Sequence, residues 1–281
     1  MKTMRLGDQH VPVLGMGTWH MGETSTARSA EEAASLQFGL DNGLSVIDTA
    51  EMYGEGAAER VVGRAIAGRQ RADIYLISKF YPWHATDSEI RRALTRSLTR
   101  LGTDYLDMYL LHWRGTTPLT ETISTLRDLQ NEGLIRSYGV SNFDTVDLKE
   151  ARAVRGGKGV VANEVLYNLA ARGIEYDLMP QQEQAGVSLI GYSPFGSGDG
   201  RSIELPQELV ELAQARSLTG HQLMLAWALR SGRVLSIPKA GTPAHMRENI
   251  EAAEVELDDN ELALIDAFFP APQEKVPLAE I

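Results

Sequence analysis

Four polar side chains stand at or just after the ends of short apolar runs in the sequence. Asp48, Lys79 and His112 each close such a run. Tyr53 follows five residues after Asp48. Each has an ordinary explanation on its own, as a loop cap, a surface charge, a hydrogen-bonded core histidine or a packed aromatic ring. Together they supply a carboxylate, an ammonium group, an imidazole and a phenol, which is a set suited to acid-base chemistry.

The most specific chemistry open to this set is donation of a proton to an oxygen that is gaining negative charge. A free tyrosine titrates near ~10 and is a poor acid at neutral pH, but a neighbouring ammonium group lowers its pKa. Lys79 is the candidate source of that charge, and Asp48 would keep Lys79 ionised and oriented. His112 can donate a hydrogen bond to a carbonyl oxygen. We therefore expect Lys79 to lower the pKa of Tyr53 and so activate the phenol as an acid.

The composition excludes several other classes of function. The chain has 281 residues, with 27 Lys and Arg against 38 Asp and Glu, and a net charge of −11. This balance argues against nucleic acid or an anionic membrane as a partner. The absence of cysteine excludes thiolate nucleophiles, iron–sulfur clusters and cysteine zinc sites, and we expect no metal. Neither a signal-peptide core nor a run of roughly 18 apolar residues is present, so we expect a cytoplasmic protein.

The elements that must position the four residues follow a regular alternation. Short β-branched, apolar runs begin near residues 13, 44, 74, 105, 135, 160, 187 and 234, and most gaps between them have helical apolar spacing. This pattern predicts one α/β domain over residues 1–281, a closed parallel (β/α)8 TIM barrel with its chemistry at the carboxyl ends of the strands. An open doubly wound sheet would favour G-x-G-x-x-G after the first strand, but His20 stands where the third glycine belongs.

Two departures from the alternation carry their own predictions. The segments Met4–Leu6 and Val11–Val13 flank Gly7 and Asp8, which indicates an N-terminal β-hairpin that plugs the lower end of the barrel. The gap before the last strand is longer than the others and leaves room for an extra helix. The helices expected near the C-terminus cover residues 206–216, 222–229 and 259–268, besides one after Pro243.

At this point the sequence resembles the aldo-keto reductase superfamily over nearly its whole length. The resemblance implies a (β/α)8 barrel that reduces aldehydes and ketones with NADPH and without metal. It implies that Tyr53 is the proton donor, that Lys79 and Asp48 tune its pKa, and that His112 orients the carbonyl group. The segments that carry it are Gly15-Met-Gly-Thr-Trp19, Ile47-Asp-Thr-Ala-Glu-Met-Tyr53-Gly, Ser78-Lys79, Leu110-Leu-His112-Trp, Gly139-Val-Ser-Asn142-Phe, Tyr192-Ser-Pro-Phe-Gly-Ser197-Gly and Ile237-Pro-Lys239.

The resemblance also implies a cofactor site built from loops at the strand ends. The Gly/Ser-rich loop after Tyr192 can present backbone N–H groups to a pyrophosphate, and the segment from Lys239 to Asn249 would cover the adenosine end. The expected cofactor residues are Gly17, Thr18, Trp19, Asp48, Ser141, Asn142, Glu164, Tyr192, Ser193, Pro194, Phe195, Gly196, Ser197, Gly198, Pro238, Lys239, Ala240, Gly241, Thr242, His245, Arg247, Glu248 and Asn249.

The sequence departs from the family pattern at two cofactor positions. Glu164 stands where the family usually has a glutamine that contacts the nicotinamide carboxamide; an ionised Glu164 can accept the amide N–H but cannot donate to the carbonyl. His245 replaces an arginine that commonly lies near the 2′-phosphate, with Arg247 two residues on. We expect NADP(H), because Lys239 can still contact a phosphate, with NAD as the alternative.

The substrate is expected to be a small carbonyl compound held in an aromatic pocket. Because the tail after Phe269 is short, we expect broad specificity. Arg114 follows Trp113 where the family often has proline, and we hypothesise that it favours substrates with a carboxylate. The expected substrate residues are Trp19, Tyr81, Trp83, His112 and Trp113.

Two other functions stay open, and so does the oligomeric state. A lysine at the end of a barrel strand can act as a Schiff-base nucleophile, as in aldolases. A cofactor-binding regulatory subunit, similar to the potassium-channel β subunits that share this fold, is the other alternative. We expect a monomer, because a closed barrel leaves no unpaired sheet edge.

Overall fold

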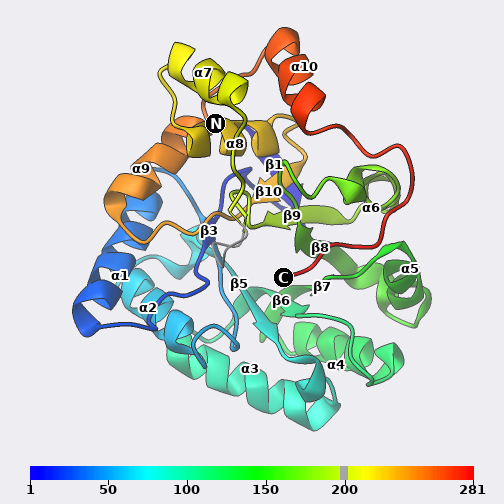
Figure 1. The fold of residues 1–281 in the computed structure, drawn as a ribbon. Coiled ribbons are helices and arrows are strands. Elements are labelled where there is room, and N and C mark those ends of the chain that lie inside the picture. Colours follow the sequence, from blue (N-terminus) through cyan, green and yellow to red (C-terminus); the bar gives the residue numbers. More distant parts are fainter. Residues whose placement is uncertain (197–201) are drawn as a thin grey trace.

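Short apolar segments pair side by side as parallel strands, in the order in which they occur along the chain (Figure 1). Buried side chains cover both faces of the central strands, which is why these strands are continuous apolar runs. In residues 1–196 and 202–281, which the computed structural model describes, the eight barrel strands are β3 (Met16–Gly17), β4 (Val46–Asp48), β5 (Tyr75–Phe80), β6 (Leu106–Leu111), β7 (Ile135–Ser141), β8 (Val160–Leu166), β9 (Ser188–Tyr192) and β10 (Val234–Ser236).

The first and last strands meet and close the barrel. Isolated parallel bridges join Leu14 to Ser236 and Gly17 to Lys239. The Gly15 amide donates to the Ser236 carbonyl at 2.8 Å, and the Ser236 amide donates to the Val13 carbonyl at 2.9 Å. The predicted (β/α)8 barrel is therefore confirmed.

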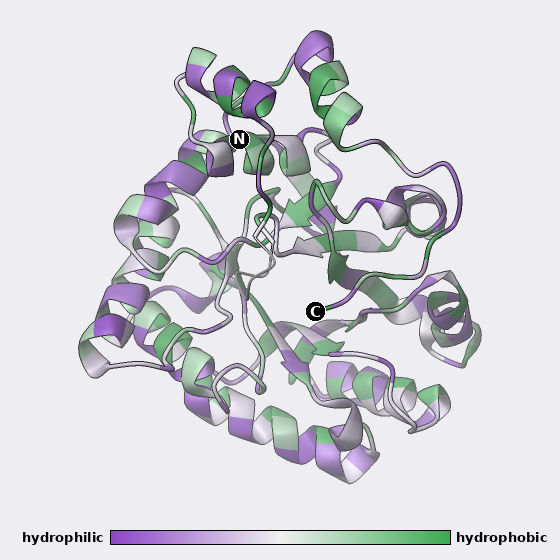
Figure 2. Ribbon diagram, viewed as in Figure 1, coloured by the Kyte–Doolittle hydropathy of each residue, from purple (hydrophilic) through white to green (hydrophobic). Residues whose placement is uncertain are grey.

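Helices surround the strands and turn their apolar faces toward them (Figures 1 and 2). Within the described part of the chain, 3-10 turns lie at Arg71–Asp73, Pro82–His84, Gly157–Gly159 and Gly173–Glu175. The α-helices of the described residues are α1 (Thr26–Asp41), α2 (Ala57–Ile66), α3 (Asp87–Leu101), α4 (Leu119–Asn131), α5 (Thr145–Ala153), α6 (Leu178–Ala185), α7 (Gln207–Ala215), α8 (Gly220–Leu229), α9 (Pro243–Ala252) and α10 (Asp259–Phe268). The extra helices predicted near the C-terminus are present. None of the described helices is both long and apolar enough to cross a membrane.

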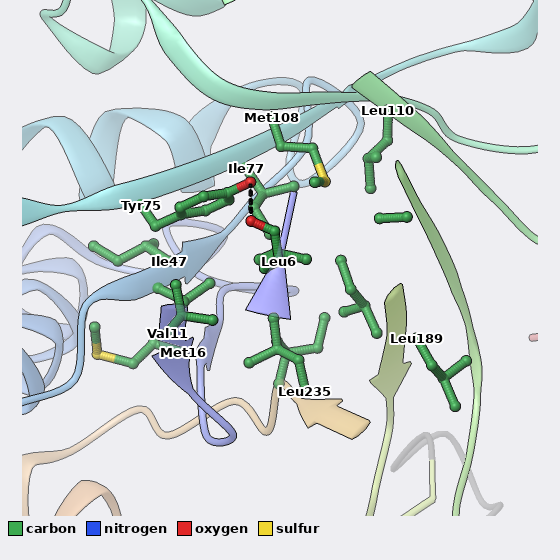
Figure 3. Close-up of a cluster of buried hydrophobic side chains, with 14 of the residues drawn as sticks. Leu6, Val11, Met16, Ile47, Tyr75, Ile77, Met108, Leu110, Leu189 and Leu235 are labelled. Carbon is green, nitrogen blue, oxygen red and sulfur yellow. Dashed lines mark hydrogen bonds between the residues drawn. The ribbon is translucent and has the colours of Figure 1, made fainter. Parts of the chain in front are cut away.

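The predicted N-terminal hairpin is present as β1 (Thr3–Leu6) and β2 (Gln9–Pro12), which pair antiparallel. It contacts the first residues of two barrel strands: the Tyr75 hydroxyl reaches the Leu6 carbonyl at 3.5 Å, and Ser188 donates to the Arg5 carbonyl at 3.0 Å. Leu6 packs among buried side chains from several strands (Figure 3). The hairpin thus covers the amino-terminal end of the barrel and leaves the carboxyl ends of the strands open.

Replacing Leu6 with alanine tests whether the hairpin belongs to the core. Leu6 is fully buried, so Leu6→Ala should lower the free energy of unfolding by about 2–5 kcal/mol in urea titrations. Val146→Ala is the control, because Val146 is 66% exposed and its loss should change stability by less than about 0.5 kcal/mol. Equal effects of the two substitutions would show that the hairpin does not pack on the barrel.

Candidate active site

The four residues singled out from the sequence come from three neighbouring strands. Asp48 is the last residue of β4, Lys79 lies near the end of β5, and His112 directly follows β6. Tyr53 lies in the loop between β4 and α2. Because these strands are parallel and adjacent, their carboxyl ends bring the four side chains to one end of the barrel.

The ammonium group of Lys79 is the centre of the group. Its side chain is fully buried, and Nζ donates to both carboxylate oxygens of Asp48 at 2.7 Å. Nζ also lies 3.1 Å from the Tyr53 hydroxyl oxygen and 3.2 Å from the Thr49 carbonyl oxygen. A buried cation needs such partners, because an unpaired charge is costly away from water. The predicted Asp48–Lys79–Tyr53 arrangement is present in the structure.

A fourth buried partner of Lys79 was not expected from the sequence. Glu164 lies in β8, and its Oε1 is 3.2 Å from Lys79 Nζ. We expected Glu164 to face a cofactor amide, and nothing in the spacing of residues along the chain indicated an ion pair across the barrel interior. The sequence signal that could have drawn attention to it is a carboxylate, next to Asn163, in a strand whose other residues are apolar.

Burial and the nearby carboxyl groups oppose each other at Lys79 but act together at Glu164. Burial acts to lower the pKa of Lys79, but the charges of Asp48 and Glu164 outweigh it and raise the pKa well above the ordinary value. Burial, together with the nearby charge of Asp48, raises the pKa of Glu164 to about 8. Lys79 is therefore charged at neutral pH, which makes it a poor Schiff-base nucleophile.

The expected direction of the shift at Tyr53 is wrong. Burial raises the pKa of the Tyr53 phenol by more than the charge of Lys79 lowers it, and Asp48 and Glu164 add to the rise. The two carboxylates offset the single ammonium charge on which the prediction relied. Tyr53 thus keeps its proton at neutral pH. Since its oxygen accepts a hydrogen bond from Lys79, its own O–H is free to donate elsewhere.

His112 completes the group as a neutral ring. Burial, and then the charge of Lys79, lowers the pKa of His112 well below its ordinary value. Its ring lies edge-on to that of Tyr53, with 5.8 Å between centroids. A neutral imidazole has one N–H, so His112 can donate one hydrogen bond to an oxygen held beside Tyr53.

A cavity of about 700 Å³ opens over these side chains. Asp48, Tyr53 and His112 line it. It also collects much of the expected cofactor site, from strands β3, β4, β7, β8 and β9 and from the loops after β3, β7, β9 and β10. The expected cofactor residues in the lining are Gly17, Thr18, Trp19, Asp48, Ser141, Asn142, Glu164, Tyr192, Ser193, Pro194, Phe195, Gly196 and Lys239.

Part of the expected cofactor site lies outside this lining. Ser197 and Gly198 lie outside the described residues. Several of the others have structural roles: the Pro238 carbonyl accepts from the Gly17 amide at 3.1 Å, and Thr242 caps α9. The residues not in the lining are Pro238, Ala240, Gly241, Thr242, His245, Arg247, Glu248 and Asn249.

Arg28 of α1 is a cation near this region that the sequence analysis missed. A side chain added at Gly241 would meet Arg28 Nη2 at 2.5 Å and Lys239 Nζ at 3.2 Å, so the two cations converge beside one glycine. Arg28 also pairs with Glu31 at 2.6 Å and lies 3.7 Å from Glu32, so Lys239 contributes most of the positive charge here. No pattern in the sequence pairs these residues, because α1 and the loop after β10 come together only when the barrel closes.

Three of the five residues expected for the substrate pocket line this cavity. Trp19, His112 and Trp113 line the cavity, but Tyr81 and Trp83 lie outside its lining. Tyr81 stacks on Trp83 at 4.2 Å between ring centroids, and Trp83 is 61% exposed. Both residues lie in the segment that follows β5, and their rings lie edge-on to Trp113 of the cavity lining, at 6.0 and 5.7 Å between centroids.

Arg114 also lies outside the cavity lining. Its guanidinium pairs with Glu150 at 3.0 Å and lies 3.8 Å from Asp147. The hypothesis that it selects substrates with a carboxylate therefore has no support, because two carboxylates of α5 already neutralise its charge. Apolar residues that the sequence analysis missed complete the lining, and among them are Met52, Ile203, Leu205, Met224 and the terminal Ile281.

The C-terminal tail forms part of the wall of the same cavity. From α10 the chain runs back across the barrel, and its end lies near the barrel centre in Figure 1. Ile281 thereby contributes to the cavity wall.

Within the described residues, no group of three His, Asp or Glu side chains is placed to hold a metal ion.

Comparison with known proteins places this geometry in a family. Residues 13–269 match the Aldo/keto reductase family. The chain is 44% identical over 274 residues to methylglyoxal reductase YeaE of Escherichia coli (strain K12), covering 97% of this chain and 96% of that protein.

Solved structures agree in fold over the whole chain. An aldo-keto reductase from Klebsiella pneumoniae in complex with NADPH is 47% identical, with a TM-score of 0.95 and coverage of 100% of this chain and 99% of the other. A structure of an aldo/keto reductase from the same organism with NADP and acetate is 46% identical, with the same TM-score and coverage. On these matches, together with the barrel and the buried Asp48–Tyr53–Lys79 group, the chain belongs to the aldo-keto reductase family.

Proposed function

We propose that this protein reduces small aldehydes and ketones to alcohols with NADPH, and that Tyr53 donates the proton. The observation that carries the proposal is the contact of 3.1 Å between Lys79 Nζ and the Tyr53 hydroxyl oxygen beside a cavity of about 700 Å³. The name of the Escherichia coli relative supports methylglyoxal, a small reactive dicarbonyl, as the first substrate to assay. We expect other small carbonyl compounds to be accepted as well.

The residues present fit a nicotinamide dinucleotide. Ser141, Asn142 and Tyr192 form a polar group in the lining, in which Tyr192 donates to Asn142 Oδ1 at 2.9 Å. Lys239 and Arg28 supply two cations beside Gly241 for the phosphate-bearing end. The NADPH and NADP complexes of the Klebsiella pneumoniae structures support the same choice.

Each polar side chain of the site has a distinct task in the proposed reaction. When bound, NADPH supplies the hydride that the carbonyl carbon receives. Tyr53 donates its proton to the carbonyl oxygen, and Lys79 stabilises the phenolate that Tyr53 becomes. Asp48 keeps Lys79 charged and in place. His112, a neutral donor, holds the carbonyl oxygen as its negative charge grows.

We further propose that the chain works as one domain and as a cytoplasmic monomer. The closure of β3 on β10 supports the monomer, because no strand edge of the described barrel is left to pair with another chain. Sedimentation of the purified protein distinguishes a monomer from a larger assembly.

Removing the hydroxyl of Tyr53 tests the proposed proton donor. Tyr53→Phe should lower kcat for methylglyoxal by about 100-fold or more, because no other described acid of the site can replace a positioned phenol. NADPH binding, followed by fluorescence titration, should change by less than about threefold, since the phenyl ring remains. Tyr176→Phe is the matched control, because Tyr176 is 49% exposed and lies outside the cavity lining. Retained turnover in Tyr53→Phe would contradict the proposal.

Removing a cation at the edge of the cavity tests the choice of cofactor. Lys239→Ala should weaken NADPH binding about tenfold and NADH binding much less, because the 2′-phosphate is the difference between the two cofactors. Lys158→Ala, an exposed lysine away from the cavity, should leave both dissociation constants unchanged. Tighter binding of NADH than of NADPH by the unmodified protein would contradict the proposal.

A further inference from the structure

Glu164 places a second carboxyl group on a single buried ammonium group. Its Oε1 lies 3.2 Å from Lys79 Nζ, while Asp48 already holds the same nitrogen through both of its oxygens at 2.7 Å. The side chains of Lys79, Asp48 and Glu164 are 0%, 2% and 2% exposed. Solvent therefore cannot screen the charges of this group.

The surroundings of Glu164 do not supply a second cation. Ser141, the last residue of β7, and Asn142, which follows it, carry no charge. Both contact the Glu164 main chain: the Ser141 hydroxyl donates to the Glu164 carbonyl oxygen at 2.9 Å, and the Asn142 main-chain N–H donates to the same oxygen at 2.8 Å. Glu164 Oε2 is buried and has no hydrogen-bond partner among the described residues. The titratable groups that act on Glu164 are Asp48 from β4, Tyr53 from the loop after β4, Lys79 from β5 and Tyr192 from β9. His112 lines the same cavity as a neutral ring.

The charge count decides which protonation state this group can hold. With both carboxyl groups ionised, the buried cluster of Asp48, Glu164 and Lys79 carries one net negative charge. The phenolate left after Tyr53 gives up its proton would add another negative charge beside it. With Glu164 neutral, the cluster carries no net charge before the reaction and one negative charge after it, which is far less costly in a buried site.

We propose that Glu164 is a positioning residue that works in its protonated, neutral form, sharing its hydrogen with the carboxylate of Asp48. The two carboxyl groups lie within hydrogen-bonding reach of each other. The shared hydrogen joins the two carboxyl groups, and Lys79 keeps one full counter-charge. This inference rests on the proposed function, because it concerns how well Tyr53 donates its proton.

Ionisation of Glu164 weakens the proton donor. Burial and the charge of Asp48 raise the pKa of Glu164 to about 8, so it is mostly protonated at neutral pH and loses its proton in mild alkali. The new charge further raises the pKa of Tyr53 and competes with the phenolate for Lys79. Carbonyl reduction should therefore decline above about pH 8, and the decline should disappear when a neutral amide replaces Glu164.

The test compares the unmodified protein with Glu164→Gln, a neutral isostere of the protonated side chain. With NADPH saturating, kcat/KM for methylglyoxal is measured between about pH 6 and pH 10. For the unmodified protein, kcat/KM should fall about tenfold one pH unit above the midpoint, whereas for Glu164→Gln it should change less than about twofold over the same interval. Glu59→Gln, which alters another buried carboxylate that pairs with Arg100, should retain the alkaline decline.

A second readout does not depend on turnover. The infrared difference spectrum between the unmodified protein and Glu164→Gln, taken without substrate, should contain the carbonyl stretch of a protonated carboxyl group at pH 7. That band should vanish as the pH rises past about 8. Thermal unfolding checks that the Glu164→Gln variant is folded. If the variant does not fold, the pH titration of the unmodified protein's infrared spectrum still tests the inference.

Two results would overturn the inference: no protonated carboxyl band at pH 7, or an alkaline decline in Glu164→Gln equal to that of the unmodified protein. Failure of the proposed function is a separate result. In that case the unmodified protein would reduce no carbonyl compound at any pH, while the infrared spectrum would still report the protonation state of Glu164.

Discussion

One fully buried ammonium group organises the active end of this barrel. Lys79 has no contact with solvent, so its charge must be balanced by groups that the fold holds in place. Asp48 provides most of that balance through two contacts of 2.7 Å, and Tyr53 supplies a further acceptor. The same contact that helps to satisfy the lysine also holds the tyrosine oxygen, which leaves the phenol proton free. The stability and the chemistry of the site thus depend on one nitrogen atom.

The barrel is what makes such a group possible. Parallel strands place Asp48, Lys79 and His112 at the ends of neighbouring strands, and closure of the sheet brings Glu164 from β8 to the same nitrogen. The N-terminal hairpin covers the opposite end, where Leu6 packs into the apolar interior (Figure 3). Chemistry is thereby confined to one end of the barrel, beneath the cavity that the strand-end loops and Ile281 surround.

Much of this arrangement could be predicted from the sequence, for a definite reason. A strand end is recognisable as the point where an apolar run stops, so the positions of Asp48, Lys79 and His112 follow from local pattern and from the topology. The contact between Lys79 and Glu164 could not be predicted in this way, because it depends on which side chains meet across the closed interior. The expected direction of the Tyr53 shift was wrong because burial, the largest cause of the raised pKa, depends on how the closed barrel packs around the phenol, and spacing along the chain does not show this. Tyr81 and Trp83 were misplaced because aromatic character alone does not show which way a loop residue turns.

The central claim is that Lys79 and Tyr53 act as one unit, and a double-mutant cycle tests it most directly. The rate of methylglyoxal reduction is measured for Tyr53→Phe, for Lys79→Met and for the two combined, each corrected for its folded fraction. If the lysine acts through the phenol, the combined variant should be no slower than Tyr53→Phe alone, within about twofold. Losses that multiply in the combined variant would show that the two residues contribute independently and would contradict this account.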